Sequence, residues 1–328
     1  MFYLHNYINE HPDIFSAESV VTNSHLLQKF CAEIQNWALE ANEQRSLEDI
    51  KTIQLKRFQN LISHAYKTVP FWNLWMKRTG VMPSDIRSFD DINQLPIVSK
   101  LTIQNEGVKN FVSNTLDISR HHSLTTSGTV GIPLPILVDA WTKERYASIR
   151  ERSFRWINSK FSKEDHFIRI SRVNTFYPGY IVFDTFNINS LDKIGTNLYN
   201  VCHDGNCFVT SYPSFLFELA QFFEKKRITV RFKGIVSSGE KLELPVKNYL
   251  QEVFRCPIGE RYTNSAAGGT IAQTCKFGFF HINADQLLLE VVGTEESFGK
   301  TGKILVTDFN NKVMPFIRYD TGDLGEYI

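Results

Sequence analysis

The sequence lacks an excess of charge of either sign and a long hydrophobic run. Its 36 lysine and arginine residues against 35 aspartate and glutamate residues leave a formal net charge of +1, so no overall field favours nucleic acid or an anionic membrane. No stretch approaches the roughly 18 apolar residues of a membrane span. The first ten residues have no basic segment followed by an apolar one. We therefore expect no nucleic-acid partner, no membrane span and a cytoplasmic location.

Cysteine is scarce and irregularly placed. The five cysteines are Cys31, Cys202, Cys207, Cys256 and Cys275. An odd number scattered through a long chain favours reduced thiols over a disulfide framework, so we expect no structural disulfide. The segment from Cys202 to Cys207 also holds a histidine and an aspartate, but its spacing fits no compact zinc template. We interpret it as a loop with buried thiols, with a metal site as the alternative.

The composition is that of a folded protein with a large core. Of the 328 residues 42% are hydrophobic, with 18 glycines and 11 prolines, which excludes disordered and collagen-like classes. Apolar residues follow helical spacing over residues 24–77, and a further helix start is expected after Ser99. After residue 120 short apolar runs at 135–138, 167–170, 180–183 and 234–236 alternate with helical patterns, of which 213–226 is the longest. This alternation predicts an α/β fold with a buried sheet, and residues 286–292 and 303–308 predict a small β subdomain.

Hydroxyl groups and glycines gather between two apolar segments at residues 121–133. The centre of this segment is Ser127, Gly128 and Thr129. Glycines let backbone N–H groups turn toward an anion, and hydroxyl groups donate further hydrogen bonds. No lysine follows Gly131, so the Walker pattern of P-loop nucleotide hydrolases is absent. From composition alone the segment is either a phosphate-binding loop or an ordinary loop.

Three further segments follow in a fixed order. They read Ser-Ser-Gly-Glu at 237–240, Glu-Arg-Tyr-Thr-Asn at 260–264 and Pro-Phe-Ile-Arg-Tyr-Asp-Thr-Gly-Asp-Leu at 315–324. Together with 121–133 they resemble the nucleotide-binding motifs of adenylate-forming enzymes, which include acyl- and aryl-CoA synthetases, peptide synthetase adenylation domains and luciferase. Residues 55–72 and 275–283 are similar to the phenylacetate-CoA ligase and CapK-like branch. The resemblance runs from about residue 55 to the last residue.

The resemblance implies an α/β fold, namely the layered large N-terminal domain of adenylate-forming enzymes. We expect residues 1–120 to form the helical N-terminal region, 121–284 the α/β nucleotide-binding core, and 285–328 a small β subdomain that ends at the hinge. Family members continue for about 100 further residues, roughly one small domain, which carry a lysine that contacts the α-phosphate and the substrate carboxylate. The sequence stops at Ile328, so this C-terminal lid domain is expected to be absent.

The resemblance also implies roles for particular residues around ATP. Ser127, Gly128 and Thr129 would contact the β- and γ-phosphates. Ser238, Gly239 and Glu240 would line the adenine pocket. The alternative for the second group is an ordinary turn at the end of a strand.

The remaining implied site residues follow in the last two segments. Tyr262 would stack on the adenine, with Arg261 beside it in the nucleotide site. Thr263 and Asn264 would lie near the α-phosphate and the acyl carbonyl as catalytic residues, and Asp323 would accept hydrogen bonds from the ribose hydroxyl groups. A half-buried core tyrosine and a turn aspartate are the structural alternatives for Tyr262 and Asp323.

One departure concerns the metal. In the family a glutamate that helps to hold Mg²⁺ follows the aromatic residue, and here Ala266 stands in its place. Either Mg²⁺ is held by ATP, water and another acid such as Glu240 or Glu290, or adenylation is impaired. We name no protein ligand to a metal.

The implied function is ATP- and Mg²⁺-dependent activation of an acyl, aryl or amino acid as its acyl-adenylate. The acyl group would then pass to CoA, a carrier protein or an amine, which makes the chain an AMP-forming ligase that is weak without a lid domain. Two alternatives remain open: a catalytically impaired nucleotide- or partner-binding protein, and a LuxE-type acyl-protein synthetase subunit. The sequence does not identify the carboxylate.

Overall fold

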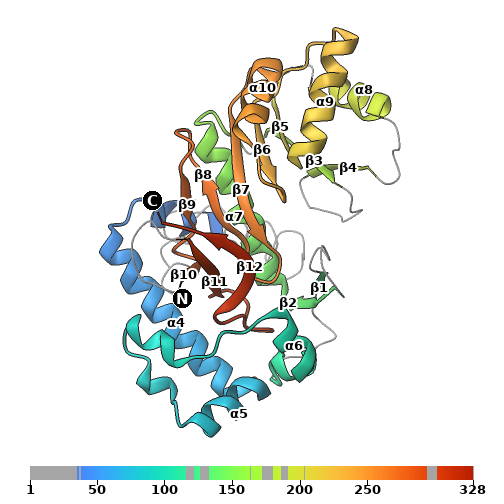
Figure 1. The fold of residues 1–328 in the computed structure, drawn as a ribbon. Coiled ribbons are helices and arrows are strands. Elements are labelled where there is room, and N and C mark those ends of the chain that lie inside the picture. Colours follow the sequence, from blue (N-terminus) through green and yellow to red (C-terminus); the bar gives the residue numbers. More distant parts are fainter. Residues whose placement is uncertain are drawn as a thin grey trace, which may run out of the picture. The chain divides into compact units, whose positions relative to one another are not determined.

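The computed structural model describes residues 35–36, 38–115, 122–125, 133–162, 164–171, 180–185, 191–202, 204–293 and 301–327 (Figure 1). The chain forms two units. Unit 1 comprises Met1–Ile149, Asn264–Ile271 and Asn283–Ile328, and unit 2 comprises Arg150–Thr263 and Ala272–Ile282. The unit boundaries cross α7 (Ala140–Ile157) and β8 (Gly269–Thr274). The three-part division expected from the sequence stays a prediction.

Helices dominate the first part of unit 1. α4 (Leu47–Thr68) begins where the Ser46 hydroxyl accepts a hydrogen bond from the Asp49 N–H at 3.1 Å, which satisfies one of the free donors of the first turn. Pro70 then starts α5 (Pro70–Thr79), because proline fits the first position of a helix but lacks the N–H that would continue α4. The predicted start after Ser99 is confirmed by α6 (Lys100–Glu106), which Ser99 caps. Three 3₁₀ turns lie between and after these helices: η2 (Pro83–Asp85), η3 (Asp90–Gln94) and η4 (Val108–Phe111).

Within its described residues, unit 1 also holds two antiparallel sheets. One is the pair β1 (His122–Thr125) and β2 (Pro135–Val138). The other has the order β10-β11-β12, with β10 (Leu287–Val292), β11 (Gly302–Asp308) and β12 (Tyr319–Gly325). Helix α4 contacts β10 through a hydrogen bond from Gln54 Nε2 to the Leu287 carbonyl at 3.0 Å.

Unit 2 is built on a mainly parallel sheet with the strand order β4-β3-β5-β6-β7-β8-β9. The parallel strands are β3 (His166–Ser171), β4 (Tyr180–Asp184), β5 (Cys207–Ser211), β6 (Gly234–Ser238) and β7 (Ile258–Asn264). Strand β9 (Phe280–Ile282) pairs with β8 antiparallel. Connections between parallel strands must cross over the sheet, and helices supply these crossovers.

Helices cover both faces of this sheet. On one face lie α8 (Leu191–Cys202), α9 (Pro213–Lys226) and α10 (Leu244–Phe254), whose apolar residues form one buried cluster with β3, β5, β6 and β7. On the other face Phe154 and Ile157 of α7 pack on Phe167, Phe208 and Val236. Unit 2 is therefore a three-layer α/β/α arrangement.

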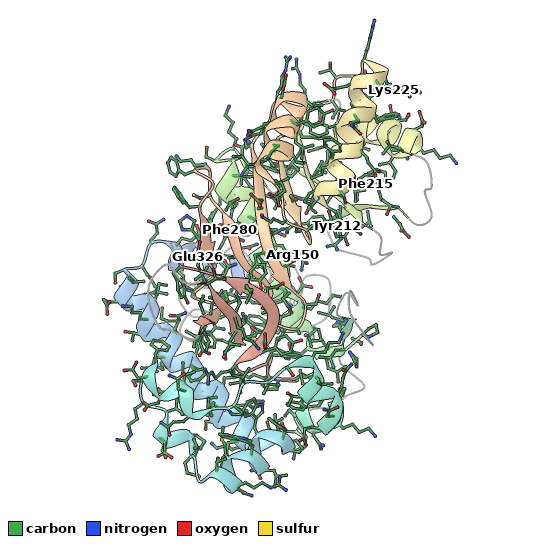
Figure 2. All side chains as sticks on the ribbon, in the orientation of Figure 1. Arg150, Tyr212, Phe215, Lys225, Phe280 and Glu326 are labelled. Atoms are coloured by element: carbon green, nitrogen blue, oxygen red, sulfur yellow. The ribbon has the colours of Figure 1, made fainter. Side chains whose placement is uncertain are left out.

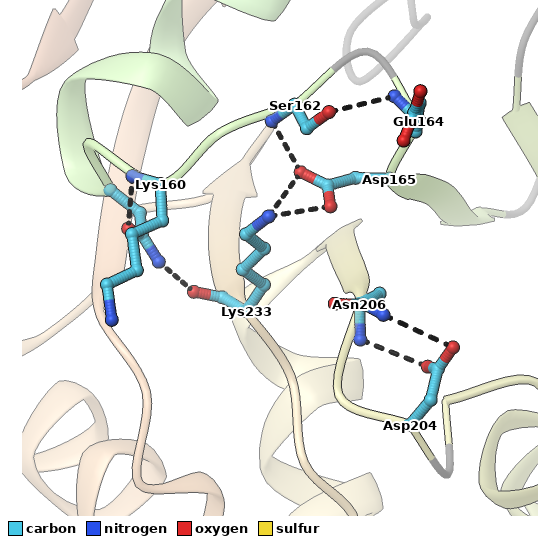
Figure 3. A network of polar contacts seen from close by, with 8 residues as sticks. Lys160, Ser162, Glu164, Asp165, Asp204, Asn206 and Lys233 are labelled. Carbon is cyan, nitrogen blue, oxygen red and sulfur yellow. Dashed lines mark hydrogen bonds and ion pairs between the residues drawn. The ribbon is translucent and has the colours of Figure 1, made fainter.

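A polar network fixes the amino end of the sheet (Figure 3). Lys233 Nζ lies 2.6 and 2.8 Å from the two carboxylate oxygens of Asp165, which also accepts the Ser162 N–H at 2.7 Å. Asn158 Nδ2 donates to the Lys233 carbonyl at 2.8 Å. The loop between α7 and β3 is thus tied to the residue that precedes β6.

The fold class expected from the sequence is confirmed. The chain is α/β with a mainly parallel sheet and a small antiparallel sheet near its end. The runs at 135–138, 167–170, 180–183 and 234–236 are strands, 213–226 is helix α9, and 286–292 and 303–308 correspond to β10 and β11. Across the described ranges every helix is too short or too polar to serve as a membrane span.

We expect Asp165→Ala to lower the free energy of unfolding by about 2–4 kcal/mol, because it leaves a mostly buried ammonium group without its carboxylate. The Lys233 and Asp165 side chains are 16% and 4% exposed. Chemical denaturation followed by circular dichroism measures the effect. The matched control is Asp192→Ala, which removes an ion pair with Lys226 whose side chains are 66% and 50% exposed, and which should cost less than about 1 kcal/mol. Equal costs for the two variants would contradict the role given to Asp165.

Candidate functional site

Two of the sequence motifs end neighbouring parallel strands. Ser238 at the end of β6 is the Cα partner of Arg261 on β7. This register puts the segment 238–240 beside the segment 261–263. Ligands of open α/β sheets bind at the carboxyl ends of the strands, so the register brings both motifs to the edge where a ligand site is expected.

Gly239 lets the chain turn directly after β6. Its φ is +87°, and a Cβ atom there would lie 2.8 Å from Cε1 of Tyr212. A side chain at this position would be strained by the backbone conformation and would displace the tyrosine ring. The chain thus does turn at the end of this strand, as the structural alternative for the segment has it, and the turn packs against the residue that precedes α9. The adenine-pocket role stays a prediction.

Glu240 fixes the amino end of α9. Its carboxylate accepts hydrogen bonds from the Ser214 N–H at 3.1 Å and from the Ser214 hydroxyl at 3.0 Å. A carboxylate is favoured at this end of a helix, where backbone N–H groups lack partners. Glu240 therefore already has a structural role at the helix terminus.

The side chains of β7 alternate between the two faces of the sheet. Arg261 is buried, donates from Nη2 to the Thr210 hydroxyl, and lies over the Phe154 ring with Cζ 5.6 Å from its centroid. Tyr262, half-buried, belongs to the opposite face, and Thr263 is exposed on the face of Arg261. Arg261 and Tyr262 are thus neighbours in sequence that serve different faces.

The turn that follows β7 belongs to unit 1 and is built on Asn264. Its side-chain oxygen accepts the Ala266 N–H at 3.0 Å, and its carbonyl accepts the Ala267 N–H at 3.1 Å. Ala266 is 1% exposed. Ala266, which the resemblance would set in the place of a metal-binding glutamate, is therefore a buried methyl group.

A buried carboxylate packs against this turn. Asp308 at the end of β11 accepts hydrogen bonds from the Tyr146 hydroxyl and, at 3.0 and 2.9 Å, from the backbone and side-chain nitrogens of Asn310. Gly268, with φ +84°, approaches so closely that a Cβ atom would lie 3.2 Å from the Asp308 carboxyl carbon. Burial raises the pKa of Asp308, which the Tyr146 hydrogen bond lowers again, and burial raises the pKa of Tyr146 well above its usual value.

The motif at 315–324 forms most of β12. Asp320 accepts the Gly322 N–H at 3.0 Å and pairs with Lys303 at 3.1 Å, and the Asp323 N–H donates to the Thr321 hydroxyl at 3.2 Å. The Asp323 side chain is exposed.

Arg318 anchors the start of β12. Its Nε and Nη2 lie 3.1 and 2.9 Å from Oε1 of Glu290, Nη1 donates to the Leu95 carbonyl at 2.7 Å, and Nη2 reaches Asn93 at 3.2 Å. Burial raises the pKa of Glu290, and Arg318 opposes that shift. Arg318 and Glu290 are thus engaged with each other in unit 1.

The described residues do not offer a protein-held metal site. No group of three histidine, cysteine or acidic side chains that could bind a metal is found among them. Glu240 binds Ser214, Glu290 pairs with Arg318, and Ala266 supplies no oxygen. In the cysteine loop, the two buried thiols Cys202 and Cys207 interact, which with burial raises the pKa of Cys202, and His203 lies outside the described residues.

Beside the Tyr212 segment lies a small cavity of about 70 Å³. It is lined by Ile170, Thr185, Tyr212, Ser214, Phe215 and Glu218, of which Tyr212 and Phe215 stand at the amino end of α9 (Figure 2). An engineered cavity that binds benzene measures about 150 Å³. The cavity is therefore too small for an aromatic ring.

The structure brings together some of the predicted site residues and separates others by unit. Ser238, Gly239, Glu240, Arg261, Tyr262 and Thr263 meet at one edge of unit 2, whereas Asn264 and Asp323 belong to unit 1. Ser127, Gly128 and Thr129 lie outside the described residues. Their roles toward a ligand stay predictions.

Sequence reasoning missed the supporting residues. Tyr146 and Asp308 carry no local motif, because they are 162 residues apart along the chain. Glu290 was expected as a possible metal-binding acid, and its pairing with Arg318 was not. The adjacent pair Gly268 and Gly269, both with positive φ, is the local signal that a tight turn lies here and that other residues pack against it.

Curated proteins provide two informative sequence relatives. The chain is 28% identical over 123 residues to a phenylacetate-coenzyme A ligase of Escherichia coli (strain K12), covering 37% of this chain and 28% of the relative. It is 22% identical over 306 residues to a phenylacetate-coenzyme A ligase of Thermus thermophilus, covering 84% of this chain and 65% of the relative. The chain thus spans less than two thirds of either relative. No family model matches the sequence.

Solved structures agree on the fold. A 2-hydroxyisobutyryl-CoA ligase in the postadenylation state, in complex with R3-HIB-AMP, superposes with a TM-score of 0.73 at 17% identity, covering 86% of this chain and 64% of that chain. An open conformation of such a ligase with 2-HIB-AMP and CoA gives a TM-score of 0.68 at 17% identity and covers 68% of that chain. The resemblance that the motifs indicated, to the phenylacetate-CoA ligase branch of the adenylate-forming enzymes, is confirmed.

We expect Tyr146→Phe to destabilise the chain by about 1.5–3 kcal/mol at pH 7.5, because a buried carboxylate loses a hydrogen-bond donor. A carboxyl group whose folded pKa is raised binds more protons in the folded chain, so stability falls as the pH rises from about 4. Without Tyr146 the pKa of Asp308 rises further, so the variant should lose more stability with rising pH than the natural chain. Its deficit should shrink at pH 4.5. Denaturation at both pH values tests this, with Tyr66→Phe on α4 as the control, and a pH-independent deficit would contradict it.

Proposed function

Because the chain shares its fold with acyl-CoA ligases and is similar in sequence to phenylacetate-CoA ligases, we propose that it activates a carboxylic acid with ATP as the acyl-adenylate and passes the acyl group to CoA or another acceptor. The observation that carries the proposal is the register Ser238↔Arg261. It joins two motifs at the carboxyl edge of a parallel sheet, where such ligands bind.

In the proposed reaction one oxygen of the substrate carboxylate attacks the α-phosphorus of ATP. A bond from carbon-bound oxygen to phosphorus forms, the bond to the bridging oxygen breaks, and pyrophosphate leaves. A thiol or amine then attacks the acyl carbonyl and releases AMP. Both steps build up negative charge on oxygen, which preorganised hydrogen-bond donors stabilise. We propose that Thr263, which is exposed on β7, is one such donor. Asn264, the next residue, is proposed to lie near the same reacting groups.

Each predicted nucleotide-binding residue is proposed to keep the role that the motifs imply. We propose that Ser238, Gly239 and Tyr262 border the adenine and that Asp323 accepts the ribose hydroxyl groups. Ser127, Gly128 and Thr129 are proposed for the terminal phosphates. Glu240, which fixes α9, would act by holding the turn at Gly239 in place.

Mg²⁺ is proposed to accompany ATP and to be held by phosphate and water rather than by protein carboxylates. The buried Ala266 and the engaged Glu240 and Glu290 support this assignment. When bound, the ion would neutralise charge on the phosphates. The acceptor of the acyl group and a cytoplasmic location also remain proposals.

The buried Ala266 and the engaged Glu240 and Glu290 also support a second candidate function, that of a nucleotide-binding protein impaired in catalysis. Exchange of labelled pyrophosphate into ATP across a panel of carboxylic acids separates the two. Exchange with any acid favours the ligase. Tight ATP binding without exchange favours the impaired protein, and a covalent acyl-protein by mass spectrometry would indicate acyl-protein synthesis instead.

We expect Asp323→Ala to weaken ATP binding at least tenfold without a change in fold. Hydrogen bonds to a charged acceptor contribute about 1.5–3 kcal/mol each, and about 1.4 kcal/mol corresponds to a factor of ten. Titration calorimetry with ATP and Mg²⁺ measures the affinity, and circular dichroism checks the fold.

The matched control is Glu326→Ala, which removes the same charge from an exposed site three residues along the chain (Figure 2). It should leave the ATP affinity within about twofold, since a distant exposed charge is screened. If Asp323→Ala and Glu326→Ala behave alike, the ribose assignment is wrong.

A further inference from the structure

The small cavity beside Tyr212 lies at the carboxyl edge of the unit 2 sheet. Ile170 is the last residue but one of β3 and belongs to the buried cluster of the α9 face. Tyr212 directly follows β5, and Phe215 lies in the first turn of α9 (Figure 2). Among the described residues the whole lining comes from unit 2. The cavity therefore belongs to the edge of the sheet where ligands of such folds bind.

The cavity shares its walls with the turn proposed to border the adenine. Tyr212, which lines the cavity, lies so close to Gly239 that a Cβ atom there would be 2.8 Å from its Cε1. Ser214, which also lines it, donates its N–H and hydroxyl groups to the Glu240 carboxylate. One side of these two residues thus faces the cavity, and another contacts the turn after β6.

The strand order relates the cavity to the two motifs of unit 2. Strand β6 lies between β5 and β7, and neighbouring strands are about 4.8 Å apart. A nucleotide bound by the motifs would lie over the ends of β6 and β7, where Gly239 and Tyr262 stand. The end of β5 is the next position along the edge. An acyl group that extends from such a nucleotide toward β5 would therefore reach the cavity.

The walls of the cavity suit only a short apolar group. Ile170 is buried and Phe215 is half-buried, whereas Ser214 and Glu218 are exposed. Apolar surface gains free energy where it leaves water, so an acyl tail gains by contact with Ile170 and Phe215. A longer tail would meet the Glu218 carboxylate and solvent, where it gains nothing.

The volume of the cavity limits the size of that group. It measures about 70 Å³, and an engineered cavity of about 150 Å³ holds the six carbons of benzene. In proportion, the cavity holds about three carbon atoms. A phenyl ring would have to displace the ring of Phe215.

Resting on the adenylate-forming function proposed above, we propose that the substrate is a short aliphatic acid with about three carbons beyond its carboxyl group. Phe215 is the specificity residue that sets this limit, because its ring forms the apolar wall opposed to a larger acid. Ile170 closes the cavity at the sheet. The acid is thus distinguished by its size.

The test uses stable adenylate analogues, so it does not depend on turnover. Two acyl-sulfamoyl adenosines, one with a butanoyl and one with a phenylacetyl tail, are compared by titration calorimetry. The natural chain should bind the butanoyl analogue at least about tenfold more tightly, because a hydrophobic pocket discriminates by about that factor against even one additional methylene. A third analogue with a hexanoyl tail should bind no more tightly than the butanoyl one.

The variant Phe215→Ala removes one phenyl ring from the wall and so makes room for the ring of the phenylacetyl tail. We expect it to bind the phenylacetyl analogue at least about tenfold more tightly than the natural chain does. The matched control is Phe217→Ala, which removes the same ring from α9 where it lies against Tyr249, with ring centroids 5.2 Å apart. Residues two apart on a helix do not share a face, so this variant should keep the natural preference.

The outcomes separate the size inference from the proposed function. If the natural chain binds the phenylacetyl analogue as tightly as the butanoyl one, the size inference is overturned while the adenylate site stands. The same holds if Phe215→Ala, with a natural circular dichroism spectrum, leaves the ratio of the two affinities unchanged. If the natural chain binds none of the analogues, the adenylate site itself is wrong and this inference falls with it.

Discussion

The parallel register of β5, β6 and β7 is the constraint on which the candidate site of unit 2 depends. Thr210 pairs with Val236, and Ser238 pairs with Arg261, so these strands end close to one another. A slip of one residue would move every side chain to the other face and would take Arg261 away from Thr210. The register is held by apolar clusters on both faces and, at the amino end, by the Asp165–Lys233 ion pair.

In unit 1, buried charges fix the segments that carry predicted site residues. Arg318 and Glu290 join the start of β12 to β10, and Asp308 with Tyr146 supports the turn after β7. Such pairs add little net stability over apolar packing, but the loss of one partner is costly. They therefore hold two short segments in place, the turn at residues 264–268 and the start of β12.

Local signals made much of the fold predictable. The bounds of α9 follow from Pro213 at its first turn and the lysines at its end, and the buried strands follow from short apolar runs. The motifs predicted that Ser238 and Arg261 lie in one nucleotide site. The register pairs the two residues on neighbouring strands, and their roles toward a ligand stay predictions. The supporting pairs could not be predicted from local sequence patterns, since Tyr146 and Asp308 are 162 residues apart along the chain. The hydrogen bonds between Glu240 and Ser214 could not be predicted from the sequence, because they depend on where the first turn of α9 lies relative to the turn after β6.

Alternation along β7 lets one strand present neighbouring residues to the two faces of the unit 2 sheet. Tyr262 and Arg261 are adjacent in sequence yet lie on opposite faces, and Thr263 returns to the face of Arg261. On the proposed function, Tyr262 would border the adenine on one face while Arg261 packs within the other. The buried Thr210 hydroxyl and the Phe154 ring constrain any replacement of Arg261, since the new side chain must fill the same space on the sheet.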